Sequence, residues 1–434
     1  MKAAIVGYAV EGQVSANYWH ELGYEVTICD QNTSLQVPPI FKTALGDDYL
    51  DGLDSYDIIV RSAGIHPQII LDKNPSVKSK ITTSVQEFFR VCPSPNTIGI
   101  TGTKGKGTTT TLITKMLIAA GKTVHFGGNI GIAPLELLPK IAAEDWVVLE
   151  LSSFQLEDFN GPSPHIGVCL MVVPEHLNWH ADMAEYISAK QRLFATQKPT
   201  DIAIYYSQNE NSQQIAMASP GTHIPYMAYS GAEVIKDNIV IDGQTVCAID
   251  DLKLLGRHNW QNACAALTTF WQVVQDTEPA RKVLTSFTGL PFRIEFRKKI
   301  NDVRFYNDSY ASAPGAEIAA LKSIDGKKVM IVGGFDRGLD LSQLATEMVN
   351  NQSEIRKVLL IGASAERTAE ALKQVNFSNF EQCKVRSMSE IVSTAYNLAQ
   401  PGDAVVLSPG FASFDMFKNF EDRGIQFNDA VEKL

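Results

Sequence analysis

The sequence predicts an α/β protein of three domains, each built on a largely parallel sheet. Its 434 residues suffice for about three domains of roughly 150 residues each. Short apolar runs typical of buried strands alternate with segments of helical spacing, and several of these strands end in glycine-rich turns. We expect a Rossmann-like domain at residues 1–95, a central P-loop-like domain at residues 96–296 and a second Rossmann-like domain at residues 297–434.

The composition is that of an ordinary globular protein, with 45% hydrophobic and 20% charged residues. The longest apolar runs, such as residues 166–173, are too short to span a bilayer, and the chain enters a strand directly without a signal-peptide cleavage region. A formal net charge of -10 and the lack of a basic block argue against a nucleic-acid partner. The six cysteines are scattered without metal-type spacing, which is typical of reduced residues in a cytoplasmic protein.

A glycine-rich turn between a buried strand at residues 97–100 and a helix that runs to about residue 120 is the strongest local signal. Such a turn presents unpaired N–H groups and the positive end of a helix dipole to an anion. Lys106 adds a mobile positive charge, and Thr108 or Thr109 can offer a hydroxyl to Mg²⁺. The standard P-loop spacing is not met, because its first glycine would fall at Ile100. A purely structural turn is the alternative, but the lysine and the hydroxyls favour a triphosphate site formed by Gly102, Thr103, Lys104, Gly105, Lys106, Gly107, Thr108 and Thr109.

Residues 2–30 form a predicted βαβ unit whose first turn resembles a Rossmann fingerprint. The turn runs Gly7-Tyr8-Ala9-Val-Glu-Gly12, with Ala9 in place of the middle glycine, and the second strand ends on Asp30. A second turn, which contains Ser62 and Gly64, follows another buried strand at the same sheet edge. This pattern alone leaves open a dinucleotide, another nucleotide or a purely architectural role.

Polar residues follow the strands of the central domain. Glu150 ends a buried strand, where a magnesium ligand belongs beside a P-loop, and a surface glutamate is the alternative. The next strand is predicted at residues 166–173, and His176, which follows it, is a metal ligand or a structural histidine. The helix that begins near Asp182 carries Tyr186 and Lys190 on one face, and Lys190 taken alone is an ordinary surface lysine.

Two further positions lie later in the chain. Asn259 and Asn262 stand at the start of a helix, where their amides either cap it or reach a base. Arg293 lies in a loop that enters a strand and is either a clamp for a transferred phosphoryl group or a surface arginine. The last domain shows four buried strands without a P-loop, and the loops at their carboxyl ends carry Asp308, Asp336, Arg337 and Ser413.

Taken together, these motifs resemble the Mur ligase family along the whole chain, and most of all its D-glutamate-adding type. The resemblance rests on residues 101–108, 127–131, 150–156, His176 with Lys190, residues 258–259, 307–309 and 408–424. It implies a monomeric, cytoplasmic, ATP-dependent amide ligase that adds D-glutamate to UDP-N-acetylmuramoyl-L-alanine during peptidoglycan precursor synthesis.

The resemblance also implies roles for individual residues. Lys106, Glu150, His176 and Lys190 would be catalytic. Thr108 and Glu150 would bind one Mg²⁺, and His176 with Lys190, carbamylated by CO₂, would serve a second. The ATP contacts would add Asn259 and Asn262 at the adenine, Asp308 at the ribose and Arg293 at the γ-phosphate. The UDP substrate would be held by Gly7, Tyr8, Ala9, Gly12, Asp30, Ser62, Gly64 and Asn129, and the amino acid by Tyr310, Ser312, Arg337, Ser413 and Phe420.

The implied chemistry needs no protein nucleophile. The alanyl carboxylate attacks the γ-phosphate of ATP to give an acyl phosphate, and the amine of the incoming amino acid then displaces phosphate. Catalysis is positioning plus charge neutralisation by two magnesium ions and a lysine. Water must be kept from the acyl phosphate, which predicts that the last domain closes over the central one.

Several positions depart from the pattern of the D-glutamate-adding type. After residues 307–309 that type usually has Lys-Ala-Thr-Asn, whereas this chain has Tyr310-Ala-Ser312-Ala313. Phe292 replaces a usual histidine, Asn178 a usual aspartate and Gly107 a usual hydroxyl residue, which leaves Thr108 as the remaining ligand candidate of the loop. Because a cation is lost at Tyr310, a ligase for another acceptor amino acid is an alternative. A non-catalytic UDP-sugar or nucleotide sensor is another.

Overall fold

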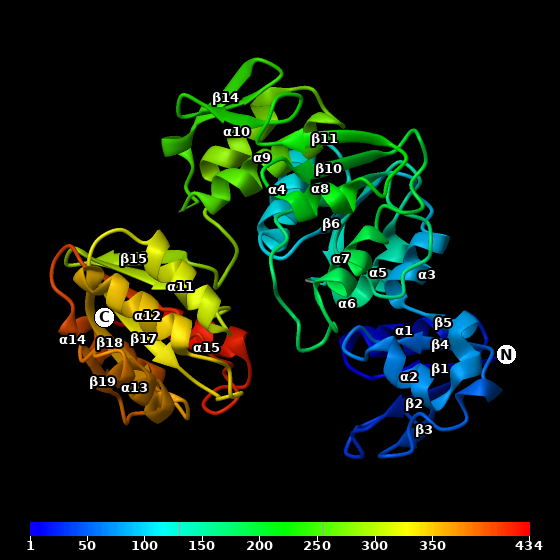
Figure 1. Cartoon of the computed structure of the whole chain (residues 1–434), viewed down its shortest axis with the longest axis horizontal. Helices are drawn as coiled ribbons and strands as arrows, with labels where there is room; N and C mark the ends of the chain where they lie inside the picture. Colours follow the sequence, from blue (N-terminus) through cyan, green and yellow to red (C-terminus); the bar gives the residue numbers. More distant parts are fainter. Residues whose placement is uncertain (130, 255) are drawn as a thin grey trace. The chain divides into compact units, whose positions relative to one another are not determined.

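The computed structural model describes residues 1–129, 131–254 and 256–434, which divide into two compact units (Figure 1). Unit 1 contains Met1–Leu252 and His258–Ser286, and unit 2 contains Lys253–Arg257 and Phe287–Leu434. Ile130 in the predicted turn at residues 127–131 and Leu255 in the segment before Asn259 lie outside the described residues. We describe each unit by itself.

The N-terminal sheet of unit 1 has five parallel strands in the order β3-β2-β1-β4-β5. Along β1, Ala3 and Ile5 pack with Trp19 of α1, whereas Ala4 and Val6 pack with Ile70 of α2 on the opposite face. Because successive side chains of a strand point to opposite faces of the sheet, this one short strand contributes residues to two hydrophobic cores. The elements are β1 (Lys2–Val6), α1 (Val10–Glu21), β2 (Glu25–Asp30), β3 (Lys42–Leu45), η1 (Leu53–Ser55), β4 (Ile58–Arg61), α2 (Pro67–Lys73), η2 (Pro75–Lys80), β5 (Ile81–Thr82) and α3 (Ser84–Val91).

The central sheet of unit 1 has six parallel strands in the order β11-β10-β9-β6-β8-β7. Its elements are β6 (Thr97–Thr101), α4 (Lys106–Ala119), β7 (Val124–Gly128), α5 (Pro134–Leu137), η3 (Leu138–Lys140), β8 (Trp146–Glu150), α6 (Ser153–Leu156), β9 (Ile166–Cys169), α7 (Met183–Gln191), β10 (Ile202–Tyr206), α8 (Glu210–Ala216), β11 (Thr222–Tyr226), α9 (His258–Trp271) and α10 (Thr277–Ser286). Because β8 and β9 flank β6, the segments that follow these three strands meet at one sheet edge.

Two further features complete unit 1. A small antiparallel sheet is formed by β12 (Glu233–Ile235), β13 (Asn238–Ile241) and β14 (Gln244–Ala248), followed by η4 (Ile249–Asp251). Helix α3 precedes residue 95, yet its Val85 and Phe88 lie in the same core as Leu149 and Phe159. The packing therefore joins α3 to the central sheet.

Unit 2 contains one sheet in the order β15-β16-β20-β17-β18-β19, parallel except for β15. Val329 and Ile331 of β17 pack with helices α14 and α15, and Met330 and Val332 pack with α11, α12 and α13. The elements are β15 (Glu295–Ile300), β16 (Val303–Asn307), α11 (Pro314–Ser323), β17 (Lys328–Gly333), α12 (Ser342–Asn350), η5 (Gln352–Glu354), β18 (Ile355–Ile361), α13 (Ala365–Gln374), β19 (Phe380–Gln382), α14 (Met388–Leu398), β20 (Ala404–Leu407) and α15 (Phe420–Glu432).

The predicted α/β class is confirmed: along the chain, a P-loop-like sheet follows one Rossmann-like sheet and precedes another. The domain boundaries at residues 95 and 296 stay a prediction. One strand is shorter than expected. Residues 166–173 were predicted to be extended throughout, but β9 ends at Cys169. Beyond it the chain leaves the sheet, because Val173 N–H donates to Thr103 Oγ1 and the carbonyl of Met171 accepts from Thr103 N–H. The segment after β9 thus binds the glycine-rich turn.

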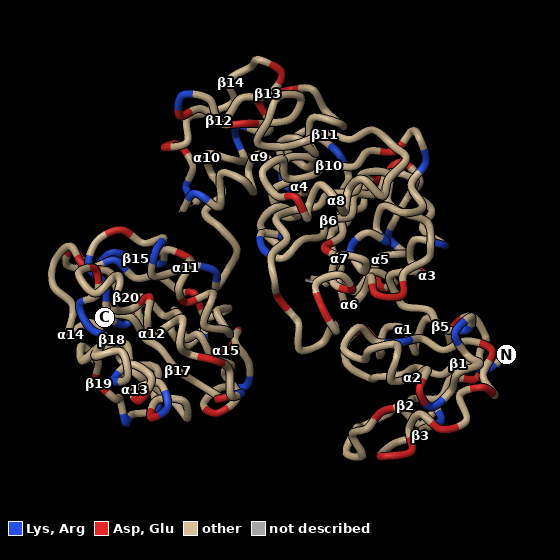
Figure 2. Tube along the Cα trace, viewed as in Figure 1, with Lys and Arg blue, Asp and Glu red and all other residues tan. Residues whose placement is uncertain are grey.

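Charged residues of both signs are interspersed along both units (Figure 2). Within the three described ranges, no helix is long and apolar enough to span a bilayer. The six cysteines are free thiols, of which Cys29, Cys169, Cys247 and Cys264 are buried.

Candidate active site

The glycine-rich turn between β6 and α4 has a shape that needs glycine at two positions. Gly102 has a φ of +145° and Gly105 a φ of +88°, which side chains rarely adopt. A Cβ on Gly105 would lie 2.2 Å from Oδ1 of Asn262 on α9, and that same oxygen accepts from Thr109 Oγ1 at 3.5 Å. Gly105 is the N-cap of α4 and supplies no side-chain acceptor to its first turn. Helix α4 therefore opens with N–H groups suited to an anion.

We expect Gly105→Ala to lower both stability and ATP affinity, because the new methyl group meets left-handed strain and the Asn262 amide together. Left-handed backbone costs about 1–2 kcal/mol and overpacking about 1–3 kcal/mol. Gly243→Ala is the matched control, since Gly243 has a φ of +71° and nothing within 4 Å of the added Cβ. Thermal unfolding with and without ATP measures both effects. Equal losses in the two variants would show that the Asn262 contact is unimportant.

The side-chain nitrogens of two lysines share the carbonyl oxygen of Gly102. Lys106 Nζ donates to it at 3.0 Å and to the carbonyl of Thr103 at 3.1 Å. Lys190 Nζ also donates to it at 3.0 Å and lies 4.4 Å above the Tyr186 ring. Lys190 is only 1% exposed, so the interpretation as an ordinary surface lysine is wrong. Burial, and then the charge of Lys106, lowers the pKa of Lys190 well below its ordinary value.

Glu150 stands at the end of β8 with one carboxylate oxygen unsatisfied. It is 2% exposed, which excludes the surface-glutamate alternative, and β8 pairs it with Ile100 of β6. Oε1 accepts from Asn129 Nδ2 at 2.8 Å, whereas Oε2 is buried without a hydrogen-bond partner. Leaving a buried acceptor unpaired is costly, and a hard cation is the natural partner of such an oxygen. The predicted Thr108 lies half-buried in the first turn of α4.

His176 lies in the segment that leaves β9, with a φ of 60°. Its ring stands edge-to-face with Phe154, with centroids 4.8 Å apart. Burial lowers its pKa below the ordinary 6.5; Glu175 raises it, and Lys106 and Lys190 lower it further. The imidazole is therefore neutral at neutral pH, as a metal ligand must be. The structure thus brings Lys106, Lys190 and His176 together around the glycine-rich turn.

Among the described residues, one group of histidines and acids has ligand atoms within 4.8 Å of one another: His66, Glu157 and Glu185. It differs from the predicted metal set of Thr108, Glu150, His176 and Lys190. His66 Nδ1 accepts the N–H of Gln68 at 3.1 Å as the cap of α2, so the proton of the neutral ring is on Nε2. Nε2 faces Glu185 Oε1 at 3.3 Å. We interpret this group as polar contacts between elements.

The predicted nucleotide turn of the N-terminal sheet is assembled at the carboxyl ends of β1, β2 and β4. Tyr8 N–H donates to Asp30 Oδ2 at 2.8 Å, and Ser62 Oγ donates to the carbonyl of Gly7 at 2.7 Å. A Cβ on Gly12 would lie 2.1 Å from the same carbonyl oxygen, which explains the glycine in the first turn of α1. Ala9 is the N-cap of α1. Asn129, assigned to the same ligand, instead lies beside Glu150.

In unit 2, the residues predicted to bind the amino acid and the ribose surround the carboxyl end of β16. Arg293 lies over the Tyr310 ring at 3.7 Å, and Tyr310 stands edge-to-face with Phe420 at 5.1 Å. Arg337 donates to the carbonyl of Ser312 at 2.6 Å. Asp308 Oδ2 accepts from Ser408 Oγ at 2.7 Å. Ser413 is 2% exposed, and Asp336 is paired with Arg367.

Asp308 should make the stability of unit 2 fall as pH rises. Burial raises its pKa from the ordinary 3.8 to about 7, against the opposing hydrogen bonds from Ser408 and Ile294. Between these pH values the folded state keeps a proton that the unfolded state releases, so the free energy of unfolding decreases with pH.

Asp308→Asn should therefore flatten the pH dependence of the unfolding midpoint across this window. Asp336→Asn is the control, because pairing with Arg367 lowers the pKa of Asp336. Its carboxyl is therefore ionised in both the folded and the unfolded state across this pH window. An unchanged slope in Asp308→Asn would contradict the prediction.

Sequence reasoning missed two buried arginines and one buried acid. Arg423, 1% exposed, donates to the carbonyl of Ser309 at 2.9 Å and holds the segment before Tyr310 in place. Glu317 is fully buried with neither carboxylate oxygen hydrogen-bonded. Arg61, also 1% exposed, ends β4. A charged residue directly after the apolar residues 58–60 was the available signal for Arg61.

Comparisons with known proteins agree with this architecture. The family model described as the Mur ligase middle domain matches residues 100–270, and the model described as the Mur ligase, glutamate ligase domain matches residues 292–411. A relative from Acetivibrio thermocellus, named UDP-N-acetylmuramoylalanine–D-glutamate ligase, is 35% identical over 457 residues, which cover 100% of this chain and 96% of the relative. A relative of the same name from Clostridium botulinum is 36% identical over 453 residues, covering 100% of this chain and 97% of the relative.

Solved structures show the same fold at lower identity. The UDP-N-acetylmuramate–alanine ligase from Thermotoga maritima has a TM-score of 0.60 at 15% identity, covering 100% of this chain and 99% of that chain. A MurF ligase from the same organism, in complex with ADP, has a TM-score of 0.60 at 16% identity, covering 99% of this chain and 94% of that chain. The fold is thus shared with these two solved ligases. The chain belongs to the Mur ligase family.

Proposed function

We propose that this protein is an ATP-dependent ligase that joins D-glutamate to UDP-N-acetylmuramoyl-L-alanine in peptidoglycan precursor synthesis. The observation that carries the proposal is the gathering of Lys106, Lys190 and His176 around the glycine-rich turn, with the unsatisfied Glu150 on the neighbouring strand. The full-length relatives of the same named activity support the choice of substrates.

The reaction passes one phosphoryl group from ATP to a carboxylate and then replaces it by an amine. The carboxylate oxygen bonds to the γ-phosphorus as the bond to ADP breaks, which gives an acyl phosphate. The amine of D-glutamate attacks the acyl carbon, loses a proton, and inorganic phosphate leaves. The first turn of α4 and the ammonium of Lys106 hold phosphate oxygens, so that the protein supplies position and charge rather than a nucleophile.

The residues around the turn fit magnesium. Glu150, through its unpaired Oε2, and Thr108 would hold one ion, and the neutral His176 with a modified Lys190 would hold a second. When bound, Mg²⁺ neutralises the negative charge of the phosphates. Glu150 is held in place for this role by Asn129.

Carbamylation of Lys190 is supported by the environment of its amine. Only a neutral amine attacks CO₂, and the buried site beside Lys106 favours that form. The nitrogen bonds to the CO₂ carbon, one proton is released, and the neutral amine becomes an anionic carbamate. The carbamate attracts the ammonium of Lys106 and supplies oxygen ligands for a hard metal.

Other residues would place the three substrates. We assign the UDP moiety to the turn formed by Gly7, Tyr8, Ala9, Gly12, Asp30, Ser62 and Gly64, with Asn129 near the reacting end. Asn259 and Asn262 would contact adenine, Asp308 the ribose and Arg293 the γ-phosphate. Tyr310, Ser312, Arg337, Ser413 and Phe420 would surround D-glutamate. We expect unit 2 to close over the ATP site in a monomeric, cytoplasmic enzyme.

A different acceptor is the second candidate. In unit 2, the guanidinium of Arg293 stacks on Tyr310. The D-glutamate-adding type of the family usually has a lysine at the position of Tyr310. A charge-assisted hydrogen bond is worth about 1.5–3 kcal/mol. Replacing the lysine by Tyr310 therefore changes which acceptor amino acid binds best. Arg337 supplies a further positive group for an acidic acceptor.

Phosphate release with UDP-N-acetylmuramoyl-L-alanine, ATP and a panel of amino acids tests the proposal. Turnover with D-glutamate alone is expected, together with a product whose mass increases by one glutamyl residue. Turnover with another amino acid only would reject D-glutamate and retain the ligase. No turnover with any amino acid, despite UDP-substrate binding, would favour a sensor.

A further inference from the structure

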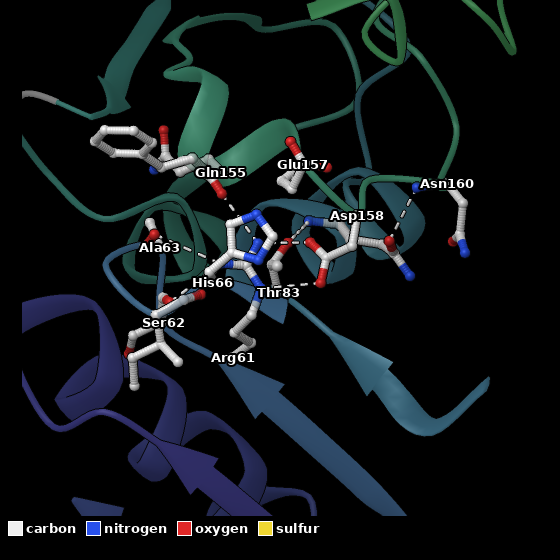
Figure 3. Close-up of polar contacts among 12 residues, drawn as sticks. Arg61, Ser62, Ala63, His66, Thr83, Gln155, Glu157, Asp158 and Asn160 are labelled. Carbon is white, nitrogen blue, oxygen red and sulfur yellow. Dashed lines mark hydrogen bonds and ion pairs between the residues drawn. The ribbon is translucent and has the colours of Figure 1, made fainter. Parts of the chain in front are cut away.

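Arg61 ends β4 and immediately precedes the turn that contains Ser62 and Gly64. Its side chain is fully buried and forms a bidentate ion pair with Asp158, which follows α6 in the central part of unit 1 (Figure 3). Nε donates to Asp158 Oδ2 at 2.9 Å and Nη2 to Asp158 Oδ1 at 2.6 Å. This fork geometry is specific to arginine and fixes the direction of the contact as well as its length.

The same guanidinium also donates to backbone carbonyls, both in the turn after β4 and in α6. Nη1 donates to the carbonyl of Ile65 at 2.7 Å and to that of Ser62 at 3.2 Å, so it holds the turn at both ends. Nη2 also donates to the carbonyl of Phe154 on α6 at 2.9 Å. Every one of these acceptors is anionic or a carbonyl oxygen, which compensates the cost of burying the charge.

The segment that carries His176 and Lys190 also contacts this turn and the residue that follows it, His66. Trp179 Nε1 donates to the carbonyl of Gly64 at 3.3 Å. His66, which follows the turn, faces Glu185 of α7 at 3.3 Å and packs against the Trp179 ring. The turn is therefore tied to the two segments that follow β8 and β9, the strands that lead to Glu150 and to His176.

We propose that Arg61 is a positioning residue that holds the UDP-substrate turn in register with the phosphoryl-transfer site. This inference rests on the proposed function, in which Ser62 and Gly64 hold the UDP substrate and Glu150, His176 and Lys190 serve the ATP site. The carboxylate of the substrate must reach the γ-phosphate in line, and a displacement of about 1 Å at such a distance from the chemistry costs about 10²-fold in rate. Arg61 touches neither reacting group.

Steady-state kinetics of the full-length enzyme with Arg61→Ala and Arg61→Lys test the proposal. Arg61→Ala should lower kcat/KM for the UDP substrate by about 10²-fold, with the KM for ATP changed less than twofold. Guanidinium ion at millimolar concentration should restore part of the loss, because it can refill the site between Asp158 and the turn. The kcat/KM of Arg61→Lys for the UDP substrate should lie between the values of the wild type and Arg61→Ala, since a single ammonium cannot bind Asp158 and the carbonyls together.

Arg356→Ala is the matched control. Arg356 forms the same bidentate pair with Asp403 within unit 2, at 2.8 and 3.2 Å, and is not part of the proposed machinery. It should lower the unfolding temperature without the selective loss toward the UDP substrate. A loss in Arg61→Ala that guanidinium does not restore, with the KM for ATP and for D-glutamate raised as much as the KM for the UDP substrate, would show a merely structural role and overturn the proposal.

Two further results keep the test decisive. If Arg61→Ala does not fold, Arg61→Lys with the same kinetics takes its place, and wild-type kcat/KM in that variant would overturn the proposal. If the wild-type enzyme shows no turnover, the proposed function fails. Calorimetric titration of wild type and Arg61→Lys with UDP-N-acetylmuramoyl-L-alanine then tests Arg61 separately. Weaker binding in Arg61→Lys supports its role at the turn, and equal binding contradicts it.

Discussion

Lys190→Ala is expected to lower kcat by about 10³-fold and to regain part of the loss when formate or acetate is added. Removing one group that stabilises transition-state charge typically lowers kcat by about 10²–10³-fold, and here the carbamate of that group would also be a metal ligand. The physical reason is the buried amine beside Lys106, whose pKa is lowered well below its ordinary value and whose carbamate would supply oxygen ligands to Mg²⁺. A short carboxylate fits the space left by the side chain and replaces those oxygens.

Phosphate release at increasing formate concentration measures this effect, with an unfolding scan to show that the variant is folded. Lys198→Ala is the control, because Lys198 is an exposed lysine that follows α7. Wild-type activity in Lys190→Ala would refute the carbamate role. A loss of activity that no carboxylate restores would show that Lys190 acts as an amine.

Lys106→Ala should lower kcat by about 10²–10³-fold through two separate effects. The first is the loss of the ammonium that holds phosphate oxygens at the opening of α4. The second acts on Lys190, because the charge of Lys106 lowers the pKa of Lys190 and its removal favours the protonated amine, which does not react with CO₂. The variant should therefore need a higher pH for activity than the wild type.

Profiles of kcat against pH at saturating bicarbonate check this coupling. Lys122→Ala, an exposed lysine beyond the other end of α4, should leave the profile unchanged. A uniform loss in Lys106→Ala at every pH would retain the phosphate role and reject the coupling to Lys190. An unchanged kcat would reject both.

Much of the fold could be predicted from the sequence because buried parallel strands are nearly continuous apolar runs. The strand predicted at residues 97–100, for example, is observed as β6, Thr97–Thr101. The end of β9 was not predicted, because Leu170–Val173 is apolar enough to extend a strand. Its backbone partners instead lie in the glycine-rich turn, a tertiary effect that no local pattern reveals.

The site was predictable where one short motif carries the geometry, as at Gly105 and Lys106. It was less predictable where burial decides chemistry. Lys190 taken alone predicts a surface lysine, but its pKa is lowered first by burial and then by the charge of Lys106, which is distant in sequence. Arg61 depends in the same way on Asp158, 97 residues further along the chain. A resemblance to a family supplied the role of Lys190, and only the folded chain revealed Arg61.

The most direct measurement of the central claim is the transfer of an oxygen atom. UDP-N-acetylmuramoyl-L-alanine labelled with ¹⁸O in the alanyl carboxylate is incubated with ATP and D-glutamate, and the released phosphate is analysed by mass spectrometry. The account predicts one ¹⁸O atom in each phosphate released, in step with the amide product, because the carboxylate oxygen leaves with the phosphoryl group. Phosphate without the label, or phosphate formed without amide, would contradict it.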